Sequence, residues 1–403
     1  MEGPAAMSQA TQTPAGQAPA APEPQAAAPD LLYGPDETDL RGAVRALLTD
    51  RAGWRDVLAR TESGQSYDTG LWRTLAAEVG CAGLLVPEAQ GGAGASYREA
   101  AVVAEELGRA AAAVPFLGSA VVATTALLTA GDDELLGQLA SGAQTAALAI
   151  PFAAGPADRG ADGAGPAPTV RLGGPAAGDT DGTYRLTGTV TGVADALTAD
   201  VLIVPADGVP YALYAVRVSD PGVTMTPVTS LDMTRQLGDL TLDGAAGRRI
   251  ATGGTARAAV AGALTAGAGV LASEQLGMAE RCLEMTVAYV KERRQFARPV
   301  GSFQAIKHRL ADWWVAVIQA RAAARYAATC LAAGDPDTPV AVAVAKATCS
   351  DVALKAAQET IQLHGGIGFT WEHPAHLYLK RAKADSIGFG TADAHRASLA
   401  ALA

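Results

Sequence analysis

Three patterns of apolar and polar residues follow one another along this chain of 403 residues. Apolar positions recur at helical spacing up to about residue 145, as Leu40 and Val44 illustrate. Short β-rich runs divided by turn residues follow, and helical spacing returns at Ala256. The pattern predicts a mostly α protein with a β insert, ordered as an N-terminal helical domain (31–145), a middle antiparallel β domain (146–252) and a C-terminal four-helix bundle (253–403).

Helices and loops can be placed more closely within this outline. The expected helices cover residues 37–48, 70–79, 119–130, 132–140, 256–296, 302–333, 337–364, 372–385 and the end of the chain from 392. Residues 83–110 are expected to form a short apolar run, a Gly-rich loop and a further helix. Residues 153–182, almost all Gly, Ala, Pro and Asp, predict a loop. Trp313 and Trp314 are expected to pack between helices. The first 30 residues are rich in Ala, Pro and Gln, which predicts a disordered tail (1–30).

Composition narrows the choice of partners and compartment. The net charge of −10 argues against nucleic acid as the main partner. No uninterrupted apolar run is long enough to cross a membrane, and the N-terminus lacks the basic and apolar regions of a signal peptide. Four scattered cysteines without a paired motif are typical of buried thiols in a reducing compartment (Cys81, Cys282, Cys330 and Cys349). We therefore expect a cytoplasmic protein that binds neither nucleic acid nor membrane.

One stretch combines features of an anion site, at residues 289–310 (YVKERRQFARPVGSFQAIKHRL). Basic residues in the last turn of a helix can simply offset the helix dipole. Here, however, Arg293, Gln295 and Phe296 fall within four residues, before the expected helix stop at Pro299, and Gln304 starts the next helix. A guanidinium can bind a pyrophosphate bidentately and an aromatic ring can stack on adenine. The stretch therefore predicts a nucleotide site.

A second stretch lies about fifty residues further on, at residues 358–370 (QETIQLHGGIGFT). Its helix ends at His364, and either following glycine would suffice as a helix cap. The second glycine, Gly366, indicates close approach of the backbone to a flat or anionic group. His364 alone is typical of a structural residue. His373 and His376 could form a metal pair, but no third ligand is visible beside them.

These two stretches resemble signatures of the acyl-CoA dehydrogenase family, and so does a third stretch at residues 86–110 (VPEAQGGAGASYREAAVVAEELGRA). The resemblance covers about residues 31–403. The resemblance implies an FAD cofactor whose AMP half is held by a clamp, and a flavin seated largely in a neighbouring subunit of an oligomer. Ala297 replaces the glycine usual after the clamp aromatic. The implied cofactor-binding residues are Arg293, Gln295, Phe296, Gln304, Gln362, Leu363, His364, Gly365, Gly366 and Thr391.

The resemblance fails where the family's chemistry takes place. The glutamate that removes the α-proton usually lies in a turn that here reads Gly388 to Thr391, so Phe389 occupies the position of the base. In some members the base lies on the first long helix of the bundle, and that position is Gly267. Glu274, two turns further on, is a weaker alternative that we expect to point in another direction. The family's flavin-ring motifs are also missing from AIPFAAGPADRG (149–160) and GTVTGVADALTAD (188–200).

The joint presence of a clamp and absence of a base resembles the base-less subunits of actinobacterial heteromeric acyl-CoA dehydrogenases. The first hypothesis is therefore a subunit that supplies the clamp while a homologous partner supplies the base. One alternative is a self-sufficient, homo-oligomeric flavoenzyme of the same fold that acts as a carrier-bound acyl dehydrogenase or flavin monooxygenase. Another is a catalytically silent assembly protein. The implied substrate is an acyl-CoA or acyl-carrier thioester, and the implied electron acceptor is an electron-transfer flavoprotein.

Overall fold

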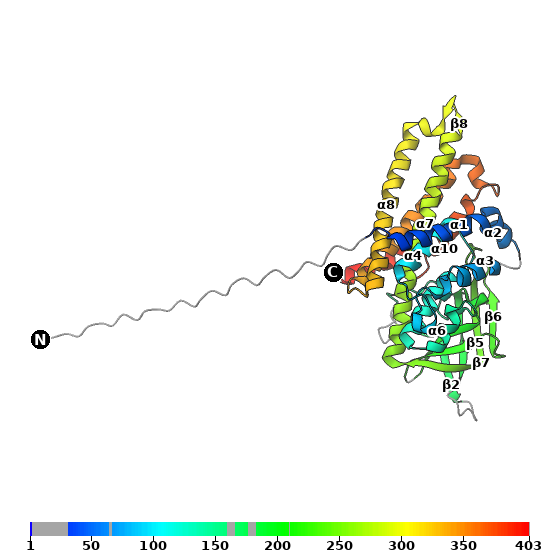
Figure 1. The fold of residues 1–403 in the computed structure, drawn as a ribbon, viewed down its shortest axis with the longest axis vertical. Coiled ribbons are helices and arrows are strands. Elements are labelled where there is room, and N and C mark those ends of the chain that lie inside the picture. The colour runs from blue at the N-terminus through cyan, green and yellow to red at the C-terminus, as the bar shows by residue number, and fades with distance from the viewer. Residues whose placement is uncertain (2–30, 64–66, 159–165, 176–182, 209, 403) are drawn as a thin grey trace.

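A computed structural model describes residues 1, 31–63, 67–158, 166–175, 183–208 and 210–402. The expected disordered tail therefore lies outside the described residues, apart from Met1. The chain runs through helices, a β-sheet and helices again, and Figure 1 shows the sheet at one end and a long helical hairpin at the other. The order of elements and the mostly helical class confirm the fold expected from the sequence.

The N-terminal helices pack as one layer against the long helices of the bundle. Helix α4 begins with a capping box. The Ser96 hydroxyl accepts a hydrogen bond from the Arg98 N–H, and the Glu99 carboxylate accepts one from the Ser96 N–H. The short helix α2, with one buried apolar residue at Val57, was not expected from the sequence. The elements are α1 (Pro35–Arg51), α2 (Trp54–Thr61), α3 (Thr69–Arg73), α4 (Tyr97–Ala110), α5 (Thr124–Ala130) and α6 (Asp133–Ala140), with π-helical segments Thr74–Glu78 and Phe116–Ala123.

The β region contains seven described strands: β1 (Ala146–Leu148), β2 (Val170–Pro175), β3 (Thr183–Ala194), β4 (Val201–Asp207), β5 (Ala212–Arg217), β6 (Val223–Pro227) and β7 (Leu237–Thr252). Most pairings are antiparallel, but β4 runs parallel to both β1 and β2, so the sheet is mixed rather than antiparallel throughout. Strand β2 also lies inside the span expected to be a loop. Its Gly-rich sequence has little intrinsic preference for a strand and therefore predicted a loop. The strand forms because it pairs with β3 and β4.

The C-terminal bundle is built around α7 (Gly253–Glu292), which is followed by α8 (Gln304–Ala333), α9 (Thr338–His364), α10 (Ala375–Asp385) and α11 (Ala392–Leu402). Glycines set the distance between α7 and the N-terminal layer. A β-carbon on Gly108 of α4 would overlap the backbone of Glu274, and one on Gly277 of α7 would overlap the backbone of Glu105. The two helices therefore cross with their backbones in close approach, which holds α7 in a fixed position.

Among the described residues, one helix is long and apolar enough to span a membrane, α7, and 67% of its most apolar window is buried inside the protein. It is the central helix of the core. All four cysteines are free and buried, as expected. Trp313 is buried between helices, but Trp314 is 57% exposed, so the expectation that it packs between helices was wrong. Adjacent residues on a helix point about 100° apart, and only one of them faces the core.

Candidate functional site

The first of the two stretches predicted to form the clamp, residues 289–310, contains a β-hairpin where the sequence predicted a helix end. Helix α7 stops at Glu292, and β8 (Arg294–Gln295) pairs with β9 (Arg298–Pro299). The expected helix to residue 296 is therefore four residues too long, and Pro299 lies in a strand rather than stopping the helix. Phe296 and Ala297 both have positive φ, at 52° and 63°, as a two-residue hairpin turn requires. Glycine suits such a φ best, so Ala297 is a strained replacement.

The charged, amide and aromatic side chains of the hairpin are exposed to solvent. Residues 291–298 are all exposed, and the ring of Phe296 is 87% exposed at the tip of the molecule (Figure 1). Arg298 lies over the ring of Phe303, with 3.8 Å between its guanidinium carbon and the ring centre. The side chain of Arg293 is exposed where α7 ends. A cationic and aromatic surface of this kind suits an anionic, ring-bearing ligand supplied from outside this chain.

The second clamp segment lies beside the first because of one aromatic stack. The ring of Tyr289, one turn before the hairpin, stacks on buried His364 at 4.3 Å between ring centres, and its hydroxyl donates to the His364 carbonyl. His364 Nδ1 also lies 2.7 Å from the Thr360 carbonyl, which holds the imidazole ring in place at the end of α9. Gly365 and Gly366 are exposed, and Gly365 has a φ of 61°. The structure thus brings the two sequence motifs together.

The remaining predicted cofactor residues divide between two places. Gln304 is exposed at the first position of α8, next to the hairpin, and Gln362 and Leu363 lie on the last turn of α9. Thr391 lies apart from the clamp, at the start of α11, where its hydroxyl accepts from the Ala394 N–H. His373 stacks on His364 with ring centres 4.1 Å apart.

In the turn at residues 388–391, where the family usually carries its base, Phe389 packs against Phe152. This aromatic pair is called the plug below. Phe389 is 4% exposed and has a φ of 51°. Its ring lies edge-on to Phe152, with ring centres 5.4 Å apart, and its N–H donates to the Phe152 carbonyl. A β-carbon on Gly267 would lie 2.9 Å from the Phe389 ring, so these two candidate base positions pack directly on each other. This role of Phe152 was not predicted from the sequence.

Little space remains beside this plug. The cavity there has a volume of about 20 Å³ and is lined by Phe152, Phe389, Ala194 and neighbouring apolar residues. Ala194 ends β3, in the segment that lacks the family's flavin-ring motif. Two groups hold the plug in place: His395 Nε2 lies 2.9 Å from the Phe389 carbonyl, and fully buried Lys346 donates to the Gly390 carbonyl at 3.3 Å. Neither was anticipated from the sequence.

Glu274 is bound in a buried ion-pair network. Its carboxylate accepts from Arg235 at 2.7 and 2.8 Å and from Arg381 at 2.8 Å. Burial by itself would raise the pKa of this carboxyl, but the two guanidiniums outweigh burial and hold the pKa well below its usual range. A carboxylate so stabilised is a weak base. The expected direction of Glu274 was also wrong, because positions seven apart on a helix share a face.

The clamp and the plug lie far apart in the same chain. Gly267 touches the plug, and Arg293 follows the end of α7, 26 residues further along one continuous helix. At about 1.5 Å per residue, that is roughly 40 Å. The two halves of an FAD molecule are joined by a single ribityl pyrophosphate chain, which does not reach that far. One FAD therefore cannot occupy the clamp and the region of the plug within one copy of this chain.

Comparison with known proteins assigns the family. The model for the acyl-CoA dehydrogenase N-terminal domain matches residues 34–142, and the model for the acyl-CoA dehydrogenase C-terminal domain matches residues 255–403. The chain belongs to the acyl-CoA dehydrogenase family, a family of oxidoreductases.

Three similar proteins are informative. Acyl-CoA dehydrogenase IpdE2 of Mycobacterium tuberculosis is 36% identical over 351 residues, which cover 86% of this chain and 91% of IpdE2. A variant of the Tcur3481-Tcur3483 steroid ACAD is 33% identical with a TM-score of 0.78, covering 91% of this chain and 97% of the other. The ChsE4-ChsE5 complex from Mycobacterium tuberculosis is 30% identical with a TM-score of 0.80, covering 92% and 98%. The two solved structures are thus assemblies of two unlike subunits.

Proteins of this family bind FAD, and a glutaryl-CoA dehydrogenase from Mycobacterium smegmatis has been solved with FADH2. The residues of this chain fit one half of that cofactor. The exposed arginine, amide and aromatic side chains at the hairpin suit a pyrophosphate and an adenine. The region of the plug does not suit a flavin ring, since Phe152 and Phe389 leave a cavity of only about 20 Å³.

Proposed function

We propose that this chain is the base-less subunit of a heteromeric, FAD-dependent acyl-CoA dehydrogenase. Its clamp would hold the adenosine and pyrophosphate of an FAD whose ring sits in a homologous partner, and the partner would supply the catalytic glutamate. FAD, when bound, accepts the hydride that leaves the β-carbon of the acyl thioester. The proposed partners further include an acyl-CoA or acyl-carrier substrate and an electron-transfer flavoprotein as electron acceptor.

One observation carries this proposal: Phe389 packs against Gly267. In members of the family that remove the α-proton themselves, a glutamate occupies one or the other of these two positions, and here the two form an apolar contact. A positioned base contributes on the order of 10²–10⁴-fold to such a step. Glu274 is a poor substitute, because Arg235 and Arg381 stabilise its charged form. The proton acceptor therefore has to come from another chain.

The position of the clamp supports the same division of labour. The hairpin is exposed at the far end of α7 from the sheet, where a second subunit can approach it (Figure 1). The structures of similar proteins include assemblies of two unlike chains, ChsE4-ChsE5 and Tcur3481-Tcur3483. The name of the second assembly includes a steroid, so we propose a bulky acyl-CoA of that kind as the substrate class.

The division of labour can be tested with variants on each side of the assembly. We would co-express this chain with homologous acyl-CoA dehydrogenase chains from the same genome and measure acyl-CoA-dependent reduction of an artificial electron acceptor. Replacing the partner's candidate glutamate with glutamine should abolish turnover and leave the bound flavin in place. Replacing Glu274 of this chain should leave any folded assembly active. If the partner variant kept full activity, the proposed division would be wrong.

A further inference from the structure

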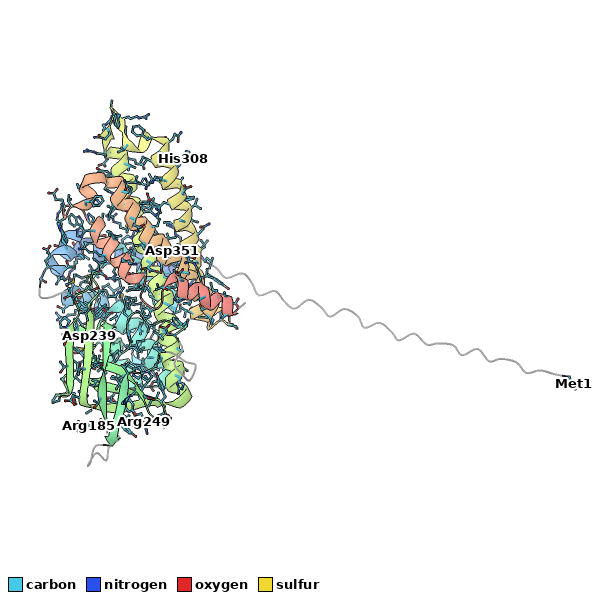
Figure 2. All side chains as sticks on the ribbon, turned by 180° about the vertical axis from the view of Figure 1, so that it is seen from behind. Met1, Arg185, Asp239, Arg249, His308 and Asp351 are labelled. Carbon is cyan, nitrogen blue, oxygen red and sulfur yellow. The ribbon has the colours of Figure 1, made fainter. Side chains whose placement is uncertain are left out.

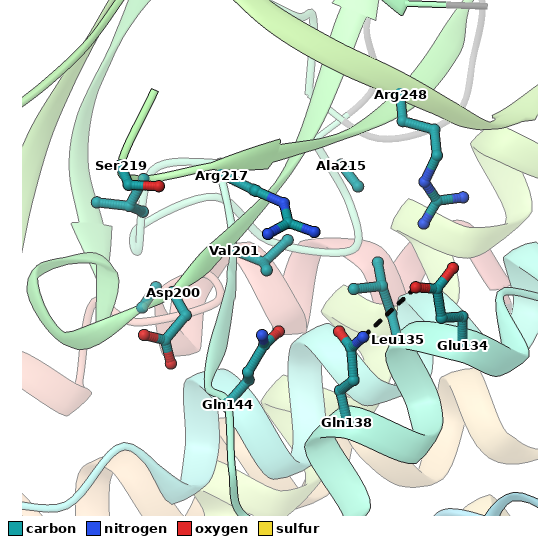
Figure 3. Close-up of a pocket in the computed structure, with 12 residues that line it drawn as sticks. Glu134, Leu135, Gln138, Gln144, Asp200, Val201, Ala215, Arg217, Ser219 and Arg248 are labelled. Atoms are coloured by element: carbon teal, nitrogen blue, oxygen red, sulfur yellow. Dashed lines mark hydrogen bonds between the residues drawn. The ribbon is translucent and has the colours of Figure 1, made fainter. Parts of the chain in front are cut away.

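A second pocket lies on the side of the sheet that faces α6, away from both the clamp and the plug. Its volume is about 520 Å³, within the usual range of small-molecule sites. Figure 3 shows its lining: the arginines come from β5 and β7, the carboxamides come from α6 and the segment before β1, and Leu135 and Val201 form an apolar wall. None of its lining residues belongs to the proposed clamp or to the cavity beside Phe389.

Two groups in the pocket lack a partner within the described part of the chain. The guanidinium of Arg217 makes no hydrogen bond or ion pair there, although it points into the pocket (Figure 3). The side-chain oxygen of Gln144 is buried and accepts no hydrogen bond. A buried acceptor left unmatched costs on the order of 1–3 kcal/mol. The pocket thus offers one unpaired cation and one unpaired acceptor.

The other charged groups show which ligand would be compatible. Arg248 contacts Asp132 at 2.7 Å and keeps further N–H groups for a ligand. Asp200 accepts from the Thr145 N–H at 2.8 Å, and Glu134 lies 3.5 Å from the side-chain nitrogen of Gln138. Two cations and two carboxylates therefore line the pocket together. A balanced lining disfavours a multiply charged anion and favours a ligand that carries both signs.

We propose that this pocket binds a small zwitterion of the amino-acid type. Its carboxylate would lie between Arg217 and Arg248, since guanidinium groups bind carboxylates bidentately. Its ammonium group would donate to the Gln144 side-chain oxygen and lie near Glu134. Its side chain would contact Leu135 and Val201. The site is independent of the proposed function, because none of these residues belongs to the clamp or the plug.

The test uses the full-length chain in the form in which it purifies. Each of the twenty amino acids is added at about 10 mM and the thermal midpoint is recorded, because a ligand that binds the folded state raises it. At least one should raise the midpoint by a few degrees. The affinity for that amino acid is then measured by calorimetry. Arg217→Ala should weaken it about tenfold or more, which is the scale of one charge-assisted contact.

Arg249→Ala provides a matched control. Arg249 neighbours Arg248 on β7, but its guanidinium lies over the ring of Tyr184 at 4.9 Å, near the far end of the sheet (Figure 2). This variant should bind like the natural chain, and the N-acetyl and amide forms of the same amino acid should not bind. The proposal is overturned if no amino acid raises the midpoint, if Arg217→Ala binds unchanged, or if the blocked forms bind as well.

Discussion

The ring of Phe389 lies against Gly267, so closely that a β-carbon added to Gly267 would lie 2.9 Å from one ring carbon and 3.0 Å from two others. The two residues come from a turn before α11 and from the middle of α7, 122 positions apart in the sequence. Phe389 is large where a glutamate would be expected, and Gly267 is small enough to admit its ring. The ring of Phe389 fits only because residue 267 has no side chain. Together the two residues fill the region where the α-proton would be removed.

Gly267→Ala should destabilise the chain by about 1–3 kcal/mol, because the added methyl overpacks the ring of Phe389. Urea denaturation measures the loss. Gly262 lies on the same helix with no atom closer than 3.9 Å to an added β-carbon, so Gly262→Ala should instead be neutral or stabilise by about 0.5–1 kcal/mol. The double variant Gly267→Ala/Phe389→Leu should recover part of the loss. Equal effects at Gly262 and Gly267 would contradict the packing described.

Glu274→Gln should cost about 3–5 kcal/mol of folding free energy, because it leaves Arg235 and Arg381 buried without their full counter-charge. Chemical denaturation of the purified chain tests this. Glu284→Gln is the matched control, since Glu284 lies on the same helix with a half-exposed side chain, and it should cost about 1 kcal/mol or less. A Glu274 variant of normal stability that loses all turnover would show that Glu274 is the base.

Lys346 predicts a dependence of stability on pH. Burial lowers its pKa to about 8, although Asp385 opposes this, and the usual value is 10.5. Between these values the folded chain has lost a proton that the unfolded chain keeps, so rising pH favours the folded state. The stability of the natural chain, relative to Lys346→Met, should therefore rise by up to about 1.4 kcal/mol per pH unit over this range.

The measurement is a set of denaturation curves for both proteins from pH 7 to 10, and the difference between them isolates Lys346 from other groups that titrate. A constant difference across that range would mean that Lys346 keeps its proton when buried, or that its site opens readily to water.

Arg293→Ala should weaken retention of flavin by the co-expressed assembly by about 1–3 kcal/mol, the scale of a charge-assisted hydrogen bond. Equilibrium dialysis against buffers of known FAD concentration, followed by absorbance at the flavin band, gives the dissociation constant. Arg171→Ala, on exposed β2 at the opposite end of the molecule, should leave it unchanged (Figure 1). Identical flavin affinity in the two variants would remove Arg293 from the proposed clamp.

Much of the fold could be read from the sequence, because long helices with regular apolar spacing carry their own signal. The ends of elements could not. The hairpin at Phe296 requires positive φ at Phe296 and Ala297. Neither residue type predicts positive φ, as a glycine would have done. Strand β2 depends on neighbours supplied by β3 and β4. Such features arise from contacts between distant residues, which no local pattern contains.

The site divides in the same way. Motifs indicated the proposed clamp and identified Phe389 and Gly267 as positions without a base. Their mutual contact could not be predicted, since it joins residues far apart in sequence. Lys346, Arg235 and Phe152 also escaped notice, because a buried lysine or arginine resembles any surface residue until its partners are known. For Phe152 the signal was present: it stands in the segment that replaces the family's flavin-ring motif.

The visible spectrum tests the central claim most directly. The chain is expressed alone and together with homologous acyl-CoA dehydrogenase chains from the same genome, and the absorbance and mass of each purified sample are recorded. We predict a colourless protein from the chain alone and a yellow, larger assembly containing both chains, because the clamp and the filled ring region of one copy cannot hold one FAD. A stoichiometric flavin spectrum from the chain alone would contradict this account.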